Sequence, residues 1–396
     1  MKRVFFTALG IFALLQSYAQ ARTDSAGFKS RKLKIDEINL VSSYYRQDAD
    51  NSAVTGGIGT EKLKDYSNTI DLKLVKYDRK LRKHNIEFEM GVDYYTSASS
   101  DMIDLKANSS SSHEDARFYP SLNWEVENEK KRSIFGIGLS SSTESDYQSY
   151  GVNVMCSKKN NNKSAEFTVK FQAYFDKLKL IDPIELRPNS NRALGTYLHS
   201  GRNSFILSGT YSQIINERLQ IMLLADIVGQ QGYLSLPFHR VYLIDSTLKQ
   251  EKLPAHRFKI PLGLRGNYFL GDKVIIKMYY RFYTDDWGLS SHTLNIEVPV
   301  KITAFLSFTP FYRFYDQTSI KYFAPYREHS ARDQYYSSNY DLSAFNSNFF
   351  GAGIRIVPLK GIFGIRRFNM LELRYGHYLK NIGMNADIIS MNIKFK

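Results

Sequence analysis

The sequence predicts an all-β fold, an antiparallel transmembrane β-barrel of about 16 strands (14–16), and three observations predict it. Segments of about ten residues alternate apolar with polar or small side chains, as membrane-spanning strands do. The connections between these segments alternate short with long. The chain also has 28 Tyr and 26 Phe but only 2 Trp, and barrels carry aromatic girdles at both membrane interfaces.

The first 21 residues have the layout of a secretory signal peptide. Lys2 and Arg3 precede an apolar run from Val4 to Leu15, and small residues follow around Ala19. The run is too short to span a bilayer as a helix, and no later stretch approaches the ~20 uninterrupted apolar residues required. We therefore expect an exported protein with residues 1–21 as a removed leader and residues 22–396 as one barrel domain in the outer membrane of a Gram-negative bacterium.

The alternation is plainest where Ile86, Phe88 and Met90 are separated by Glu87 and Glu89. The same period of two recurs along the chain and ends at Phe395, with Lys396 after it. The predicted strands are 35–46, 67–77, 85–95, 116–127, 133–142, 147–157, 165–176, 203–213, 218–228, 257–268, 273–284, 292–302, 304–315, 348–357, 368–379 and 386–395.

The connections give the barrel a direction. The short ones are 78–83, 128–132, 158–163, 215–218 and 270–272, and the long ones are near 47–66, 96–115, 177–202, 229–256 and 316–346. Outer-membrane barrels have short periplasmic turns and longer external loops. We therefore expect the long loops outside and both termini in the periplasm.

One strand parity applied to the whole barrel predicts a polarised lumen. The early strands point acids inward, and the late strands point cations inward. The acids are Asp71, Glu87, Glu89, Asp93, Glu125 and Glu166, and the cations are Arg265, Lys277, Arg281, Arg313, Arg355 and Arg374. In a closed ring the two sets would face each other across the lumen, as in the constriction of general porins. The alternative is that these charges pair across neighbouring strands and fill the interior.

The segment from Tyr280 to Thr293, with Asp285, Asp286, Trp287, Gly288 and His292 inside it, resembles the hallmark segment of a bacterial outer-membrane β-barrel family of unknown function, the DUF3570 type. Tyr233, Pro237-Phe238-His239-Arg240 and Tyr312-Arg313-Phe314-Tyr315 lie in further similar pieces. The resemblance implies a barrel and little mechanism. Asp285 to Gly288 is favoured as a tight external turn over a catalytic or ligand site.

Several function classes are disfavoured. The net charge is +14, but the basic residues are dispersed without a run of five, which argues against nucleic-acid binding. The eight His residues have no zinc-site spacing, Cys156 is expected to face lipid, and no cofactor motif is present. We expect no enzyme, cofactor or metal, although a rim hydrolase using Asp285, Asp286 and His292 with Ser290 or Ser291 stays as an alternative.

The favoured function is a passive pore or solute-transport component. The main alternative is a scaffold in an envelope complex, whose loops 229–256 and 316–346 bind a partner or plug the lumen. Expected partners are outer-membrane lipid, lipopolysaccharide and the barrel-assembly machinery. Asp24-Ser25-Ala26 and Asp245-Ser246-Thr247 resemble the short O-glycan acceptor sequence of some Bacteroidota.

Overall fold

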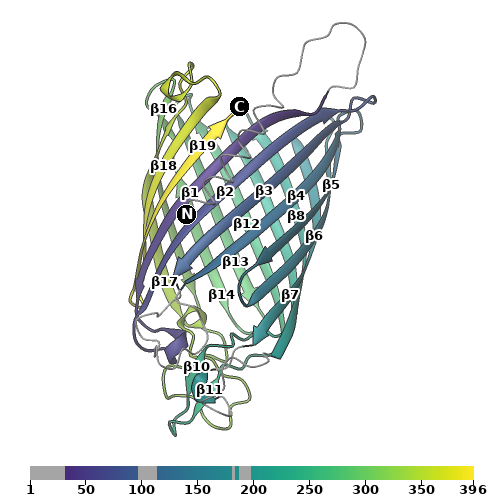
Figure 1. Ribbon diagram of the computed structural model, residues 1–396. Coiled ribbons are helices and arrows are strands. Elements are labelled where there is room, and N and C mark those ends of the chain that lie inside the picture. Colours follow the sequence, from purple (N-terminus) through teal and green to yellow (C-terminus); the bar gives the residue numbers. More distant parts are fainter. Residues whose placement is uncertain (1–31, 97–113, 181–182, 187–197) are drawn as a thin grey trace.

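The chain forms a closed antiparallel β-barrel of 16 strands, seen in a computed structural model that describes residues 32–96, 114–180, 183–186 and 198–396 (Figure 1). The wall strands are β1 (Lys34–Ala49), β2 (Glu61–Tyr77), β3 (Lys83–Thr96), β4 (Glu114–Asn128), β5 (Ser133–Thr143), β6 (Tyr147–Lys159), β7 (Ala165–Leu180), β8 (Leu198–Asn216), β9 (Leu219–Gly232), β12 (His256–Leu270), β13 (Val274–Asp285), β14 (Ser290–Glu297) with β15 (Val300–Lys301), β16 (Leu306–Gln317), β17 (Phe345–Ile356), β18 (Phe368–Lys380) and β19 (Met384–Phe395).

The remaining elements lie in the connections. β10 (Arg240–Tyr242) and β11 (Leu248–Gln250) form a separate hairpin, with Asp245-Ser246-Thr247 in its turn. The short helices are η1 (Ala53–Thr55), η2 (Ile184–Leu186), η3 (Tyr340–Leu342) and η4 (Ile362–Gly364). In the described part of the chain, no helix is long and apolar enough to cross a membrane. The predicted leader, residues 1–21, and Asp24-Ser25-Ala26 lie outside the described residues.

Pairing of the first strand with the last closes the ring. β1 pairs with β2 on one side and with β19 on the other, so that Leu40 is opposite both Ile70 and Ile393. Closure leaves no wall strand with an unpaired edge, which is what a sheet in a lipid bilayer requires. All sixteen predicted strands are present, and most extend further than predicted.

One predicted strand is interrupted. The sequence led us to expect a continuous strand over 292–302, but the chain leaves regular pairing between β14 and β15 at Val298 and Pro299. Pro299 has no N–H to donate to a neighbouring strand, and its carbonyl instead accepts from the Ile275 N–H at 3.1 Å. β15 then resumes the same wall position by pairing with β16.

The alternation of the sequence becomes the two faces of the wall. Phe88, Leu122, Leu139 and Val154 are exposed and share the outward parity, which gives the barrel an apolar outer surface suited to lipid. Cys156 is also exposed and lies on the same outward row of β6 as Val154. The intervening residues face the lumen and include most of the charges of the wall.

The two barrel ends differ in their connections (Figure 1). Lys34 and Phe395 lie at the end with the short turns, and the connections predicted to be long lie at the other end. The strict alternation was partly wrong: the β17–β18 connection, 357–367, is long at the short-turn end, while 144–146, 286–289 and 381–383 are short at the opposite end. Residues 97–113 and most of 181–197, in two predicted loops, lie outside the described residues.

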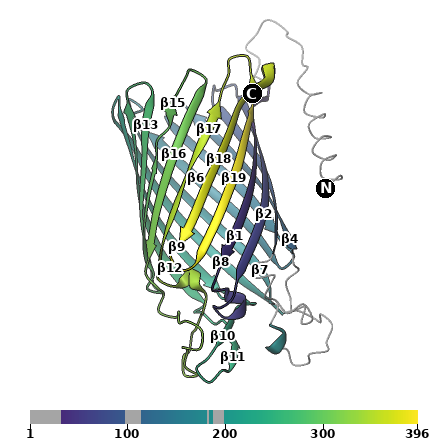
Figure 2. The same cartoon turned by 90° about the vertical axis from the view of Figure 1, so that its left-hand side faces the viewer.

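The loops 233–255 and 318–344 fold together into a cap beyond the barrel wall, which contains β10 and β11 (Figure 2). Leu253 and Ile320, one from each loop, are buried against Trp287 and Leu289 of the β13–β14 turn. The backbone of Lys252 also pairs with that of Tyr336. The cap therefore has its own small apolar core at the end of the barrel, outside the lumen.

Candidate functional site

Inward-facing carboxylates are concentrated on one side of the lumen, from β1 to β4. We call this side the acidic sector. Its carboxylates are accompanied by the inward cations Lys73 and Arg117. The sector includes five of the acids predicted to point inward, Asp71, Glu87, Glu89, Asp93 and Glu125, together with Glu37, Asp65 and Glu127. The sixth predicted acid, Glu166, lies on β7.

Inward-facing cations are concentrated on the other side, from β12 to β18. We call this side the basic sector. It includes all six predicted cations, Arg265, Lys277, Arg281, Arg313, Arg355 and Arg374, together with Arg257 and Lys259. Two inward acids of this sector, Glu297 and Glu372, were missed in the predicted charge map, although the same parity rule places them there.

The two sectors face each other. β3 and β13 are eight positions apart in the ring of sixteen, so they stand on opposite sides of the lumen. A cavity of about 620 Å³ extends along the inner wall from β3 to β13 and is lined by Glu89 of the acidic sector and by Lys259 and Arg281 of the basic sector. The structure thus brings opposite charges to the border of one continuous space.

Two acids of the basic sector form ion pairs with its cations. Glu297 accepts from Lys277 at 3.2 Å and from Arg374 at 3.1 Å. The buried Glu372 binds Arg355 at 2.7 Å and the second nitrogen of Arg374 at 3.4 Å. The Lys277–Glu297 and Arg355–Glu372 pairs join neighbouring strands, which is the cross-strand pairing that the sequence left open as an alternative. Arg374 pairs within β18 and also with Glu297 of β14, three positions away in the ring.

Other cations of the basic sector are held by aromatic rings. The guanidinium of Arg265 lies 5.5 Å from the ring centre of Tyr279, and that of Arg313 lies 5.6 Å from Phe349, both within the range of cation–π attraction. Among the described residues, no carboxylate lies within ion-pair distance of Arg281 or Lys259. Their side chains line the cavity without a carboxylate in direct contact.

Both cations and hydroxyl groups hold the acidic sector: Lys394 pairs with Glu37 at 2.6 Å and Lys159 with Glu127 at 2.7 Å. Asp93 accepts from the Ser67 hydroxyl at 2.6 Å and from the Tyr119 hydroxyl at 2.8 Å. Tyr119 reaches this position because Gly91 lies beneath it: a Cβ on Gly91 would be 2.1 Å from the ring. Lys73 binds Glu87 at 3.2 Å. Within the described chain, Glu89 and Glu125 have no cation at ion-pair distance.

Charged side chains inside the barrel are partly exposed near its short-turn end. Glu87 is 40% exposed, Lys277 44% and Arg355 48%, although all three point inward from the wall. A filled interior would bury such groups. The lumen is therefore accessible to solvent beside both sectors near the short-turn end, which fits an open interior better than a filled one.

The motif from Asp285 to Gly288 forms the predicted tight turn. Gly288 has φ of +93°, which favours glycine. The carboxylate of Asp285 is fully buried, binds Arg257 at 2.5 Å and accepts from the Leu289 N–H at 3.1 Å. Asp286 accepts from the Phe258 N–H, and the Trp287 indole donates to the His256 carbonyl. These contacts are those of a structural turn.

The residues of the hydrolase alternative are not brought together. His292 lies on the outward face of β14. Its ring nitrogen Nδ1 is hydrogen-bonded to the Tyr280 hydroxyl at 2.8 Å, and the ring packs against that of Phe282. Ser291 is buried on the opposite face of the same strand, and Asp285 is held by Arg257. Ser290 shares the outward face with His292, but its hydroxyl donates to the Thr284 hydroxyl at 3.3 Å, and in the described chain no hydrogen bond joins it to His292.

The cap crosses the mouth of the barrel. Arg240 of the 233–255 loop donates to the Val54 carbonyl at 2.8 Å, and the β1–β2 loop that contains Val54 lies halfway around the ring from the β9–β12 loop. The same guanidinium binds Glu185 at 3.0 Å. Gly57 of the β1–β2 loop packs on the Ser338 carbonyl of the 318–344 loop. We call these contacts of Arg240 and Gly57 the Arg240 cross-brace. No sequence pattern indicated them.

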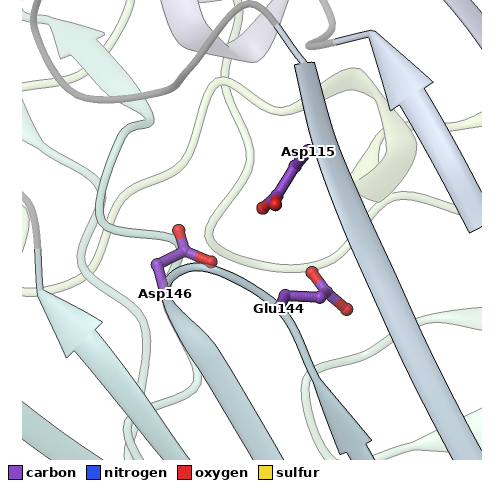
Figure 3. A group of neighbouring side chains, drawn as sticks. All are labelled: Asp115, Glu144 and Asp146. Atoms are coloured by element: carbon purple, nitrogen blue, oxygen red, sulfur yellow. The ribbon is translucent and has the colours of Figure 1, made fainter. Parts of the chain in front are cut away.

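A cluster of three acids at the cap end was also missed. Asp115, Glu144 and Asp146 converge from β4 and the β5–β6 turn, with one oxygen of each within 4.8 Å of the others (Figure 3). Burial and the neighbouring carboxylates of Asp115 and Glu144 raise the pKa of Asp146. Tyr95 donates to Glu144 and Ser145 to Asp115. The metal search in the sequence considered histidines and so did not reach this cluster.

Comparison with known proteins identifies a family of unknown function. The family model described as "Protein of unknown function (DUF3570)" matches residues 105–361. No curated protein matches the chain.

Solved structures with a similar chain path are bacterial membrane proteins. A BenF-like porin from Pseudomonas fluorescens Pf-5 is 7% identical, with a TM-score of 0.44 over 91% of this chain and 98% of that one. OccK1 (OpdK) of Pseudomonas aeruginosa is 5% identical, with a TM-score of 0.40 over 92% and 98%. A mutant of the ferric enterobactin receptor PfeA from the same species is 9% identical, with a TM-score of 0.46 over 86% and 53%.

Proposed function

This chain belongs to the DUF3570 family, and we propose that it is an outer-membrane pore that conducts small polar solutes through a transversely polarised lumen. One observation carries the proposal. Glu89 on one side and Lys259 and Arg281 on the other border the same cavity, and no ion pair in the described chain neutralises them. Facing rows of opposite charge in a water-filled pore order water and polar solutes across the passage.

The apolar outer wall supports the outer-membrane location. A closed barrel with exposed Phe88, Leu122 and Leu139 on its outer face needs lipid around it. We propose export by a leader at residues 1–21, insertion by the barrel-assembly machinery, and contact with lipopolysaccharide in the outer leaflet. We also propose the orientation with the cap outside and both ends of the barrel wall in the periplasm.

The charge arrangement selects against apolar solutes. A solute passing Glu89 and Arg281 displaces water that is aligned between the two sectors, and only a polar or dipolar solute replaces those interactions. Because Arg240 and Gly57 join the cap across the mouth, the cap stands in the path of a solute that enters from outside. The pore therefore filters by size at the cap and by polarity in the lumen.

Single-channel conductance in planar bilayers tests the pore. Refolded protein whose barrel migrates as a heat-modifiable band should give discrete conductance steps, and the same preparation after heat unfolding should give none. A folded protein without conductance would remove the open-pore proposal.

A scaffold in an envelope complex is the second candidate, and the cap favours it. The cap is folded around its own core and contains a cavity of about 530 Å³, lined by Tyr233, Leu234, Leu248, Leu253 and Tyr336 among others. A rigid, partly apolar cavity at the end of a barrel offers a partner a formed binding surface. Absence of conductance from folded protein would favour this candidate over the pore.

A further inference from the structure

The β17–β18 connection, 357–367, exposes large apolar side chains at the short-turn end of the barrel. Leu359 is fully exposed and Phe363 is 89% exposed. Ile365 of the same connection and Ile302 and Phe305 of the β15–β16 turn are also exposed. We call these five residues the rim patch. Single exposed apolar residues are common on proteins, but a contiguous group marks a contact with a membrane or a partner.

The two turns that supply the rim patch are joined by the backbone. The Val357 N–H donates to the Phe305 carbonyl at 2.8 Å. The β15–β16 turn is closed in turn by the Ile302 and Thr303 N–H groups, which both donate to the Leu306 carbonyl. The apolar side chains of the two connections therefore form one surface.

Aromatic contacts connect the rim patch to the outer wall. The ring of Phe363 meets that of Phe368 edge to face, with centroids 6.4 Å apart, and Phe368 lies 5.2 Å from Phe395. Phe395 pairs with Ile38 and follows Ile393 and Ile389 on the outward row of β19. The rim patch thus continues the lipid-facing surface past the end of the strands.

The backbone holds Phe363 outward in an unusual conformation. Phe363 has φ of +53° between Gly361 at +79° and Gly364 at +78°, a region that bulky residues rarely adopt. A Cβ on Gly361 would lie 1.9 Å from the Ile365 carbonyl oxygen, so the turn requires glycine there. Backbone strain that holds an aromatic ring in an exposed position costs free energy, and a contact between the ring and another molecule offsets that cost.

The charges around the rim patch have one sign. Lys360, Arg366 and Arg367 lie in the connection, which contains no acid, and the backbone of Lys396 donates to the Arg367 carbonyl at 2.9 Å. Cations flanking apolar and aromatic side chains match a bilayer interface, where acyl chains lie beside phosphate groups.

We propose that the rim patch inserts into the phospholipid leaflet at the short-turn end, with Lys360, Arg366 and Arg367 binding lipid phosphates. The leaflet is the periplasmic one if the proposed location and orientation hold, so to that extent the inference rests on the proposed function. The interaction itself needs only a folded barrel in a bilayer. It anchors the barrel at a defined depth and tilt through the one long connection at that end.

Spin-label depth measurements test the insertion. In a Cys156→Ser background, nitroxide labels at Leu359→Cys and Phe363→Cys are compared with a label at Asn161→Cys, in the exposed polar β6–β7 turn at the same end. The labels at 359 and 363 should be reached by oxygen better than by a water-soluble nickel chelate, and the label at 161 should show the reverse. Equal chelate access at all three sites would overturn the insertion.

A second arm tests the cations. The label at Phe363→Cys should lie deeper in phosphatidylcholine vesicles containing phosphatidylglycerol than in phosphatidylcholine alone, and Lys360→Gln with Arg366→Gln and Arg367→Gln should remove that difference. An unchanged difference would overturn the phosphate-binding role. Conductance is independent of both readouts: a silent but folded barrel with deep labels would overturn the pore and keep the insertion.

Discussion

The acidic and basic sectors of the lumen have opposite charge but are built differently. In the basic sector, the acids Glu297 and Glu372 pair with Lys277, Arg355 and Arg374. In the acidic sector, lysines pair with Glu37, Glu87 and Glu127. The hydroxyls of Ser67 and Tyr119 hold Asp93, and Glu89 and Glu125 have no cation at ion-pair distance in the described chain. The acids Glu297 and Glu372 of the basic sector are therefore structural, whereas Glu89 and Glu125 of the acidic sector are available to a solute in the proposed pore.

The largest expected effect is the loss of a buried acid at the rim of the basic sector. Asp285→Ala leaves Arg257 without its counter-charge in a site where the aspartate side chain is fully buried. Removing one partner of a buried ion pair costs about 3–5 kcal/mol. Urea unfolding of the refolded barrel should show a decrease of that size in the free energy of unfolding.

Asp286→Ala is the matched control for that variant. Asp286 is exposed and accepts one hydrogen bond, from the Phe258 N–H, so its loss should cost about 1 kcal/mol. Equal effects of the two substitutions would contradict the structural role assigned to Asp285.

A smaller effect separates the two sectors directly. Glu372→Gln removes the charge shared by Arg355 and Arg374 and should cost about 1–2 kcal/mol, reduced from the buried-pair value because Arg355 is 48% exposed. Glu125→Gln removes an acid that has no cation at ion-pair distance and should leave the free energy of unfolding unchanged or slightly higher. If both variants were destabilised alike, the two sectors would not differ in construction.

The sequence was sufficient for the wall and insufficient for the cap. Alternation in segments such as 86–94 predicted the strands, their faces and the inward positions of residues such as Glu89 and Arg281. It could do so because alternate residues of a strand face opposite sides of the barrel wall, and the apolar side must face lipid. It also contained the signal for Glu297 and Glu372. The contacts of Arg240 with Val54 and Glu185 join loops far apart in the chain, and no local pattern encodes them.

The interrupted strand at Pro299 and the long connection 357–367 show a second limit. Pro299 was visible in the sequence, but pattern reading extended the strand across it because the apolar alternation continued on both sides. The rim patch was invisible for a different reason. Leu359, Phe363 and Ile365 lie in a connection and not in a strand, so no alternation predicts which way they point. Their common exposure depends on the turn conformation at Gly361 and Gly364.

The stability of the cap should depend on pH, because the cap contains a buried carboxylate. Glu251 is buried, which raises its pKa, but His239, the Ser337 hydroxyl and the Leu236 N–H together lower the pKa below its ordinary 4.5. A lowered folded-state pKa means that the stabilisation is complete above pH 4.5 and is lost as the pH falls through the folded-state value.

The fluorescence of Trp287, which packs in the cap core with Leu253 and Ile320, reports that loss. Its emission should shift to the red below pH 4.5, and Glu251→Gln should weaken the cap at pH 7 and remove the transition. Trp124 lies on the outward face of β4 and provides a constant background. A transition that persisted unchanged in Glu251→Gln would assign it to another group.

The reversal potential across a planar bilayer, measured for Glu89→Gln and Arg281→Gln, tests the polarised lumen most directly. Both side chains line the same cavity from opposite sides, and neither is part of an ion pair in the described chain. Removing the acid should shift the reversal potential toward anion selectivity, and removing the cation should shift it toward cation selectivity. Shifts in the same direction, or no shift in either variant, would contradict a pore in which the two sectors face each other across the solute path.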